Sequence, residues 1–473
     1  MSNDHITNIR SLLIKEGYPN DCHIVPLPFS GSNRLYYRVI FNEHINPQSI
    51  IASYNDYVSE NIAHNSFTFH FRSLGFAVPE IYARDSSYKY FLIQDLGKTT
   101  LLDLLSSEKI LAEKYYKKVI SDLVKFQVIG IKDLDLDVAY PVKEFNQRSV
   151  MWDLNYFKYY FVKPHNIEFN ENLLENDFIK FANILLSAEK KYFNYRDFQA
   201  RNILIHGDQP WYIDFQGGRQ GPLQYDLVSL LYQVKANLSD DIRSKLYSHY
   251  IDELNKIIPG KQVMFEKYYY NFVYFRLMQV MGAYGFRGIV QRKAHFLQSI
   301  PMAISALKKL LQEEPIFYDL KELSKVFKQI ATLEYDIPNN ISIELTINVN
   351  SFSFKKKGIP IDVTGNGGGH VFDCRSLPNP GRLVELRDYT GLDDQIINYL
   401  EGHDEINEFI INTKKIIDQS TENYIKRGFN NLQINFGCTG GRHRSVYSAS
   451  KIGEYLMVKY PNIVVIIKHH ELD

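Results

Sequence analysis

Three polar side chains in one short stretch have the types and the spacing that phosphoryl transfer requires. Asp197 lies five residues before Asn202, which opens an apolar run over 203–205; a turn over 206–210 follows, and Asp214 lies in a second strand-like run over 211–215. These runs predict a β-hairpin whose antiparallel pairing places Asn202 opposite Asp214. Carboxylate and amide oxygens are ligands that suit Mg²⁺, and Asp197 on the preceding loop is placed to accept the proton of an attacking hydroxyl.

Each of these residues alone also has an ordinary structural explanation. Asp and Asn are common in turns, so a cap, a strand start and a strand end would account for them one by one. The joint pattern, with Gly217 and Gly218 directly behind the hairpin, favours the catalytic interpretation, although a motif match remains a hypothesis.

Length and composition restrict the class of protein. The chain has 473 residues, which predicts two or three domains, and its 45% hydrophobic content provides for buried cores. The 54 basic residues balance the 54 acidic ones, so no overall field gathers polyanions or membrane surfaces, and RNA is not expected as a partner. The three cysteines lie far apart without metal-ligand spacing, which argues against a disulfide framework and a structural zinc.

The order of predicted elements divides the chain into parts. Residues 1–97 mix strands and helices as a small lobe, and residues 98–310 are mainly helical apart from the hairpin. Residues 311–340 contain breakers and one helical stretch and are predicted to be a connector, and residues 341–473 form a smaller second domain. No apolar run approaches the length of a membrane span, and the N-terminus is polar, so we expect a soluble, cytoplasmic protein.

A nucleotide site is predicted in the small lobe. Residues 95–97 break the strand pattern as a hinge would, and an adenine ring bonding to that backbone would lie beside Gln94 and Leu96. A loop near residue 31 has room to cover phosphates with its amides, although an ordinary hairpin turn explains it equally well. No Lys stands between Ile50 and Tyr57, where a protein kinase places its phosphate-pairing lysine. The loop residues are Ser30, Gly31, Ser32 and Asn33.

Residues 20–310 resemble the aminoglycoside-phosphotransferase-like kinases, and most of all the anomeric amino-sugar kinases of the AmgK type. The motifs that carry the resemblance are Arg34-Leu-Tyr-Tyr-Arg-Val, Phe76-Ala-Val-Pro-Glu-Ile, Phe91-Leu-Ile-Gln-Asp-Leu-Gly, Arg196-Asp-Phe-Gln-Ala-Arg-Asn, and Asp214-Phe-Gln with Tyr225-Asp-Leu-Val-Ser-Leu-Leu. The resemblance implies an α+β, bilobal protein-kinase-like fold, ATP and Mg²⁺ as cofactors, and phosphorylation of N-acetylmuramate or N-acetylglucosamine at the anomeric hydroxyl. Such kinases also do without the usual strand lysine.

The same resemblance implies roles for single residues. Asp197 matches the catalytic base, Asn202 and Asp214 match the magnesium ligands, and Asp226 matches the acid that braces the catalytic loop. Two positions depart from the pattern: Gln216 replaces the glycine of Asp-Phe-Gly, and Tyr195 stands where many relatives have His.

The acceptor site has weaker signals. Trp152, Asp153 and Tyr156 lie in an aromatic-rich helix predicted over 150–162 that is able to line a sugar site, but aromatics at helical spacing are more often core residues. Arg287 and Arg292 have the charge to meet a carboxylate and are equally consistent with a solvated face.

The second domain contains a predicted anion cradle. A strand over 432–436, a tight loop over 437–443 and a helix that starts at Arg444 bring free amides, glycines and basic side chains to one spot. The purely structural alternative is a strand, a loop and a helix that bind no anion. Cys438 and Arg444 also have the Cys-x5-Arg spacing of cysteine phosphatases, with Ser445 following, so a thiolate nucleophile is an alternative, although no general acid is identifiable.

Residues 341–473 resemble the C-terminal domain of the RNase adapter protein RapZ. The matching segments are Val371-Phe-Asp-Cys-Arg-Ser-Leu-Pro-Asn-Pro, Thr390-Gly-Leu-Asp and Phe436-Gly-Cys-Thr-Gly-Gly-Arg-His-Arg-Ser-Val-Tyr. In that family the domain senses glucosamine 6-phosphate and contributes to RNA regulation, but no P-loop motif accompanies it here. The resemblance makes the following residues candidates for a sugar-phosphate pocket: Asp373, Arg375, Thr439, Gly440, Gly441, His443 and Arg444.

Together the two resemblances predict an ATP- and Mg²⁺-dependent amino-sugar kinase with a sugar-phosphate-binding module, on a bilobal kinase-like fold followed by a smaller α/β domain. The competing hypothesis is a regulatory protein that binds nucleotide and sugar phosphate without turnover.

Overall fold

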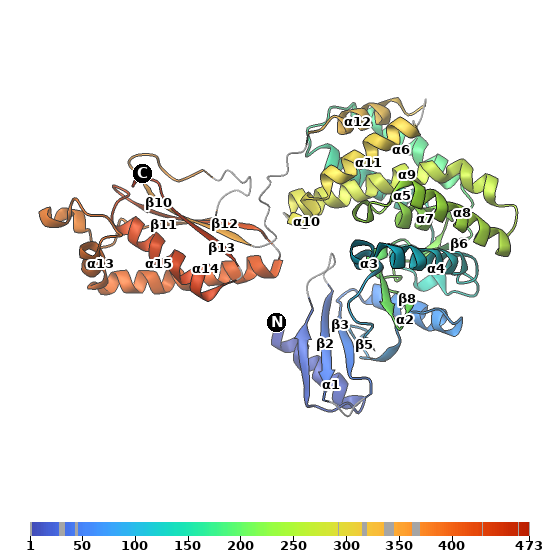
Figure 1. The fold of residues 1–473 in the computed structure, drawn as a ribbon, viewed down its shortest axis with the longest axis horizontal. Helices are drawn as coiled ribbons and strands as arrows, with labels where there is room; N and C mark the ends of the chain where they lie inside the picture. Colours follow the sequence, from blue (N-terminus) through green and yellow to red (C-terminus); the bar gives the residue numbers. More distant parts are fainter. Residues whose placement is uncertain are drawn as a thin grey trace. The chain divides into compact units, whose positions relative to one another are not determined.

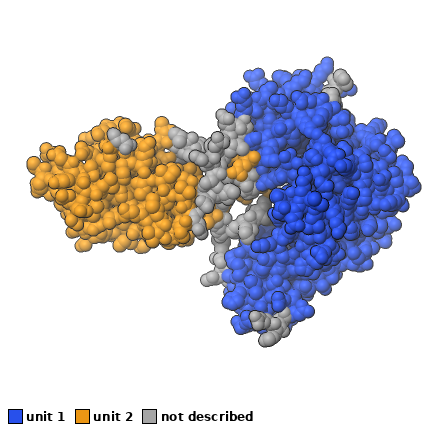
Figure 2. Space-filling view, viewed as in Figure 1, with its two compact units in different colours: residues 1–285, 299–334 blue, residues 286–298, 335–473 orange. Residues whose placement is uncertain are grey.

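The computed structural model describes residues 2–27, 34–42, 46–291, 293–314, 319–334, 345–361, 369–427, 429–461 and 463–472. Contacts divide the chain into unit 1, residues 1–285 with 299–334, and unit 2, residues 286–298 with 335–473 (Figure 2). The predicted phosphate loop, Ser30 to Asn33, and Arg292 lie outside the described residues. Among the described residues no helix is long and apolar enough to cross a membrane.

The small lobe of unit 1 is a five-stranded antiparallel sheet in the order β1-β2-β3-β5-β4 (Figure 1). Successive side chains of a strand point to opposite faces of the sheet, and one face carries buried side chains such as Tyr37, Val39 and Ile50, against which α1 packs Ile9 and Leu13. The bounds are α1 Ser2–Lys15, β1 Cys22–Pro26, β2 Leu35–Phe41, β3 Ser49–Tyr54, α2 Val58–Ser73, β4 Ile81–Arg84 and β5 Tyr90–Gln94.

The large lobe is built around α9, which is apolar on most of its circumference and packs against α5, α6, α7 and α11. Two short antiparallel pairs, β6 with β9 and β7 with β8, lie between the lobe's helices. The bounds are α3 Leu101–Ser107, α4 Lys109–Val128, α5 Gln147–Phe157, α6 Glu171–Leu186, β6 Tyr192–Asn194, β7 Ile203–His206, β8 Gln209–Tyr212, β9 Arg219–Gly221, α7 Gln224–Leu231, α8 Asp240–Ile257, α9 Gln262–Tyr284, α11 Ile300–Glu313 and α12 Lys321–Ala331.

Helix α12, in the segment predicted as a connector, packs against α6 and α11. Asp177 of α6 is 6% exposed, and its Oδ2 accepts the backbone N–H groups of Glu322 at 2.8 Å and Leu323 at 3.0 Å. These are first-turn amides of α12 that have no partner within their own helix, so Asp177 acts as a capping group from a different helix.

Unit 2 is a parallel four-stranded sheet in the order β11-β12-β10-β13. Its central strand β12 is buried along almost its whole length, as expected for a parallel strand covered on both faces. The bounds are α10 Ala294–Leu297, β10 Thr346–Ser353, β11 Gly369–Asp373, α13 Asp394–Glu401, α14 Asp404–Arg427, β12 Asn431–Cys438, α15 Arg444–Lys459 and β13 Val464–His469. The predicted fold class, a two-lobed kinase-like α+β unit followed by a smaller α/β domain, is confirmed.

Candidate active site

The hairpin that follows Asp197 is paired one residue out of the predicted register. Strand β7 begins at Ile203, and its partner β8 ends at Tyr212, so Ile203 pairs with Tyr212. The predicted pairing of Asn202 with Asp214 is therefore wrong: Asn202 lies opposite Ile213, whose N–H donates to the Asn202 carbonyl at 3.1 Å. The difference arises because Gln209 and Pro210 belong to the second strand, which leaves Gly207 and Asp208, both at positive φ, as the turn.

The Asn202 and Asp214 side chains meet nevertheless. Asp214 has left the strand with φ +69°, and its Oδ2 accepts the Asn202 Nδ2–H at 3.3 Å. The same Nδ2 donates to the Asp197 carbonyl at 2.9 Å. One amide therefore ties the loop of Asp197 to the segment of Asp214, and all three predicted residues lie around one spot.

Phe215 fixes Asp214 against the small lobe. Its ring packs on Phe71 of α2, with centroids 5.5 Å apart, and stacks on His64 of the same helix at 5.7 Å. Burial, followed by the charge of Arg34, lowers the pKa of His64 to about 3, so this imidazole is neutral and acts as an apolar surface. A movement of α2 would therefore be transmitted to Asp214.

Arg34 supplies the cation that sequence reasoning did not find. Its guanidinium lies 2.5 Å from Glu60 Oε1 of α2 and 3.3 Å from Asp214 Oδ1, and its side chain is 13% exposed. Burial alone would lower the pKa of Arg34, but Tyr36, Asp214 and Glu60 outweigh this effect and raise it, so the group is always charged. The only signal in the sequence was its place just before strand β2, beside the predicted phosphate loop.

Asp226 braces the loop before Asp197. It is fully buried, and its two carboxylate oxygens accept the backbone N–H groups of Tyr195 and Arg196, each at 2.7 Å. Burial raises the pKa of Asp226 to about 6, against the lowering effect of these amides. The bond holds Arg196 at φ +78°, a conformation that non-glycine residues rarely adopt. Tyr195 donates its hydroxyl to the Ile213 carbonyl at 2.7 Å.

Arg276 of α9 lies beside the Asp197 carboxylate. Its Nη2 is 3.7 Å from Asp197 Oδ1, and the guanidinium is hydrogen-bonded to Gln279, whose Nε2 donates to Asp153 Oδ2 at 3.0 Å. Asp153 and Arg276 are buried, whereas the Asp197 side chain is 40% exposed. The Asp197 carboxylate is therefore accessible to an acceptor molecule, and the linked polar side chains of Arg276, Gln279 and Asp153 orient it.

The hinge between the lobes is held by Asp95. Its carboxylate accepts two bonds from Arg38, at 2.6 and 3.0 Å, and one from the Ser49 hydroxyl at 2.8 Å. Gln94 is engaged in the sheet through Glu80. The Leu96 side chain is buried, but neither its N–H nor its carbonyl has a partner among the described residues. These are the backbone groups through which an adenine ring would bind.

The donor set fits a divalent cation. Because Asn202 Nδ2 is used by two acceptors, its Oδ1 faces away from them and has no bond within the part of the chain that the structure describes. The Oδ2 atom of Asp214 lies beside this amide group. The Oδ1 atom of Asp214 accepts hydrogen bonds from Gln216, at 2.7 Å, and from Arg34. One amide oxygen and one carboxylate leave most of the shell to water and phosphates, which is typical of Mg²⁺.

The residues predicted to bind the acceptor lie in different surroundings, and one of them is connected to Asp197. Asp153 joins the polar chain to Asp197, whereas Trp152 is 47% exposed and Tyr156 packs on Tyr160 of its own helical segment. Arg287 lies over the Phe296 ring at 5.2 Å within unit 2.

In unit 2 the predicted anion loop follows β12 and precedes α15. Gly441 has φ +72°, and the Arg442 carbonyl accepts the Gly391 N–H at 2.8 Å. The Thr439 carbonyl accepts the Ser353 hydroxyl at 2.7 Å, and Gly440 has open space around its α-carbon. Burial lowers the pKa of His443, which leaves the imidazole neutral near pH 7.

Arg444, Arg375 and Asp373 are connected, but not as free anion ligands. The buried Arg444 guanidinium donates to the carbonyls of Arg375 and Leu377 at 2.8 and 2.9 Å, and Arg375 forms a bidentate pair with Asp373. Cys438 accepts the Gly441 N–H at 3.2 Å and lies 3.1 Å from the Ser445 hydroxyl. Cys438 is 3% exposed, so the loop surrounds its sulfur.

Two protein families match separate parts of the chain. Residues 66–257 match the model of the phosphotransferase enzyme family, and residues 345–473 match that of the RapZ C-terminal domain. A nucleotide-binding protein of Histophilus somni strain 2336 is 37% identical over 179 residues, which cover 37% of this chain and 59% of that protein. One of Haemophilus influenzae strain 86-028NP is 39% identical over 167 residues, 35% of this chain and 55% of that protein. The chain thus spans little more than half the length of these relatives.

Solved structures that align with this chain include a choline kinase from Cryptosporidium parvum Iowa II. The alignment has a TM-score of 0.45 and 12% identity, and it covers 69% of this chain and 100% of that one. An ADP-bound aminoglycoside phosphotransferase, APH(2'')-Ib, gives a TM-score of 0.39 and 13% identity over 70% of this chain and 97% of that one.

Proposed function

We propose that this protein, in which residues 66–257 match the model of the phosphotransferase enzyme family and residues 345–473 match that of the RapZ C-terminal domain, is an ATP- and Mg²⁺-dependent kinase for an amino sugar. The acceptor is of the N-acetylmuramate or N-acetylglucosamine type, and the anomeric hydroxyl is the site of transfer. The observation that carries the proposal is the convergence of Asp197, Asn202 and Asp214 through one amide, with Asp214 also paired to Arg34.

Each group has a role in an in-line transfer. Asp197 accepts the proton of the sugar hydroxyl, and Arg276 orients its carboxylate. Asn202 and Asp214 would hold Mg²⁺, which neutralises charge on the phosphates. Arg34 supplies the positive charge that a strand lysine supplies in protein kinases, and Glu60 positions it as the helix glutamate does there. Asp226 keeps the catalytic loop in its strained conformation.

The experiment is transfer of radiolabelled γ-phosphate from ATP to a panel of hexoses, N-acetylhexosamines and N-acetylmuramate. The Asp197→Asn protein serves as the inactive control. Labelled sugar with wild type alone supports the kinase. The rival regulatory protein, without turnover, would bind nucleotide and label nothing, and labelling of a hexose in preference to every amino sugar would reject the acceptor class.

The second unit is proposed to bind a sugar phosphate through the loop from Thr439 to His443. Open space at Gly440 and the neutral, partly buried His443 support a polar ligand there. Calorimetric titration of the full chain with glucosamine 6-phosphate, in wild type and in Thr439→Val, tests this role. Equal affinity in both proteins would remove the loop from the site.

A phosphatase activity of Cys438 has one specific observation in its favour, the contact of its sulfur with the Gly441 N–H and the Ser445 hydroxyl. Against it, Arg444 is already bound to two carbonyls. Release of phosphate from an aryl phosphate by wild type that disappears in Cys438→Ser would establish this activity, and the same rate in both proteins would dismiss it.

A further inference from the structure

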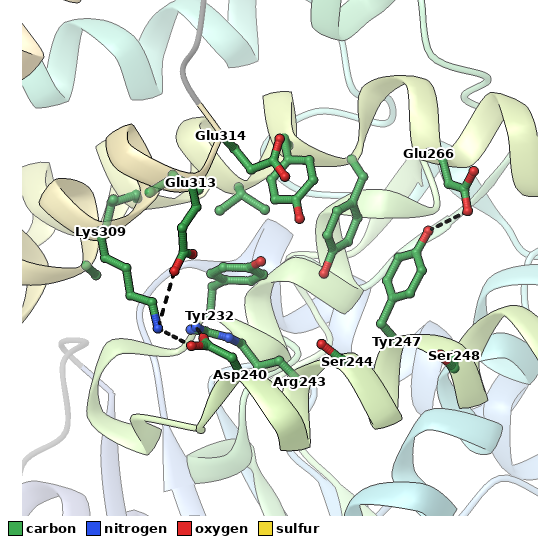
Figure 3. A pocket seen from close by; sticks show the side chains of 16 residues that line it. Tyr232, Asp240, Arg243, Ser244, Tyr247, Ser248, Glu266, Lys309, Glu313 and Glu314 are labelled. Carbon is green, nitrogen blue, oxygen red and sulfur yellow. Dashed lines mark hydrogen bonds and ion pairs between the residues drawn. The ribbon is translucent and has the colours of Figure 1, made fainter.

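A cavity of about 680 Å³ lies in unit 1 between α8, α9 and α11 (Figure 3). Its volume is that of a site for a small organic ligand. None of its lining residues belongs to the segment 195–216 that forms the candidate active site. The residues on which the argument depends are Tyr232, Tyr247, Tyr269, Tyr270, Glu266 and Glu314.

Tyrosine rings form much of the wall. The Tyr269 ring meets those of Tyr247 at 4.9 Å, Tyr270 at 5.4 Å and Tyr232 at 6.3 Å between centroids. The Arg243 guanidinium already lies 4.8 Å from the Tyr232 centroid, so this wall accommodates a cation against a ring face. Aromatic faces attract organic cations, and the attraction grows when water is displaced.

The charges of the lining do not balance. Asp240 pairs with both Arg243 and Lys309, and Lys309 Nζ is also 3.7 Å from Glu313 Oε1. Glu266 and Glu314 have no cationic partner within the described part of the chain. The donors that Glu266 has among the described residues are neutral, and one of them is the Tyr247 hydroxyl at 3.3 Å (Figure 3).

Glu314 is likewise engaged by a phenol, that of Tyr270. Burial, followed by the neighbouring Tyr232 and Glu314, raises the pKa of Tyr270 to about 12, so the phenol stays neutral and provides no positive charge beside the Glu314 carboxylate. Two negative charges therefore remain uncompensated beside the tyrosine wall. An anionic ligand such as a nucleotide would be repelled here.

We propose that this cavity binds an organic cation, an ammonium group on a small body, with the tyrosine faces around the charge and Glu266 and Glu314 as its counter-ions. The proposal does not depend on the kinase assignment. The cavity is distinct from the candidate active site, because neither Asp197 nor Arg276, which reaches Asp197, is among the residues that line it.

The test is calorimetric titration of the full chain with choline and with benzyltrimethylammonium, and with the neutral carbon isostere of choline as the uncharged probe. We expect both cations to bind and the isostere to bind at least about tenfold more weakly. The Glu266→Gln/Glu314→Gln double variant should lose about tenfold in affinity for the cations, and Tyr270→Leu about threefold. Asp241→Asn, on α8 but outside the lining, is the matched control and should bind as wild type.

Thermal unfolding of each variant identifies any that has lost its fold, and Tyr270→Leu, at a ring that is 39% exposed, provides a second independent test. Equal binding of the neutral isostere, or unchanged cation affinity in the folded double variant, overturns the proposal. So does the absence of binding by both cations. Loss of cation binding in Asp197→Asn with retention in the double variant would place the site at the catalytic segment instead, and would also refute the proposal.

Discussion

Replacing Arg34 tests the arrangement of the candidate active site most directly. Arg34→Met keeps an unbranched apolar stem and removes the guanidinium with its charge, leaving Glu60 and Asp214 without their shared partner. Arg34→Lys keeps the charge but removes the planar fork that reaches two carboxylates at once. If Arg34 supplies the phosphate-pairing charge, both changes act on the use of ATP and the first acts more strongly.

The expected size follows from the burial of the site. Loss of one preorganised charge-stabilising donor costs about 100- to 1,000-fold in rate, or about 2.7–4 kcal/mol. Leaving a buried charge unpaired destabilises a fold by about 3–5 kcal/mol, but Asp214 is 36% exposed, so the loss of stability should be well below that range. We expect kcat/KM for ATP to fall at least about 100-fold in Arg34→Met and to fall less in Arg34→Lys.

The assay is steady-state phosphoryl transfer at varied ATP, with the melting temperature measured for each protein. Arg72→Met is the matched control, because Arg72 also pairs with a glutamate, Glu80, but away from Asp214. A double-mutant cycle with Glu60→Gln isolates the coupling, which should exceed about 1 kcal/mol if the pair acts as a unit. If folded Arg34→Met retained kcat/KM for ATP within about threefold of wild type, the assignment of Arg34 would be refuted.

Three further outcomes follow from the structure. Asp197→Asn should bind ATP as wild type, measured by calorimetry, and turn over at least about 100-fold more slowly, and unchanged turnover would remove it from its role. The pKa of Asp226 is about 6 in the folded protein, above that of an aspartate in an unfolded chain. The contribution of this carboxyl to stability is therefore fully present below about pH 4 and is lost as the pH rises through about 6. Urea unfolding should therefore show wild type losing up to about 3 kcal/mol relative to Asp226→Asn between these pH values, and parallel curves would contradict this. Asp177→Ala should reduce the unfolding free energy by about 1 kcal/mol through the lost cap of α12, while Asp241→Ala, which caps nothing, should not.

The sequence predicted the elements of the site better than their register. The small lobe mixes strands and helices as predicted, and Asp197, Asn202, Asp214 and Asp226 come together as expected. The hairpin register was wrong because Pro210 was assigned to the turn, whereas it lies in a strand that tolerates the loss of one N–H. A local turn signal cannot decide how many of its polar residues join the ladder.

Arg34 and Arg276 could not be assigned from spacing. Arg34 acts 180 residues away from Asp214 along the chain, and Arg276 comes from a helix that is buried almost all round. Such partners are chosen by tertiary packing, and a charged residue in a sequence is more often a solvated one. The cavity between α8, α9 and α11 was missed for the same reason, since its tyrosines look like core residues at helical spacing.

The position of α2 links the proposed nucleotide side of the site to its proposed metal side. Glu60 and Phe71 lie on this one helix, and they hold Arg34 and Phe215 respectively, on either side of Asp214. Because Arg34 shares Asp214 Oδ1 with Gln216, a phosphate that draws Arg34 toward itself would remove the charged one of these two donors and leave that oxygen more available to a cation. ATP and Mg²⁺ should then bind with positive coupling, and by linkage each should raise the affinity of the other by the same factor. Titration of ATP at several Mg²⁺ concentrations measures this factor. In Arg34→Met, the factor should fall toward the value that formation of MgATP in free solution produces by itself. If the variant retained the wild-type coupling, Arg34 would not be the element that connects the two sites.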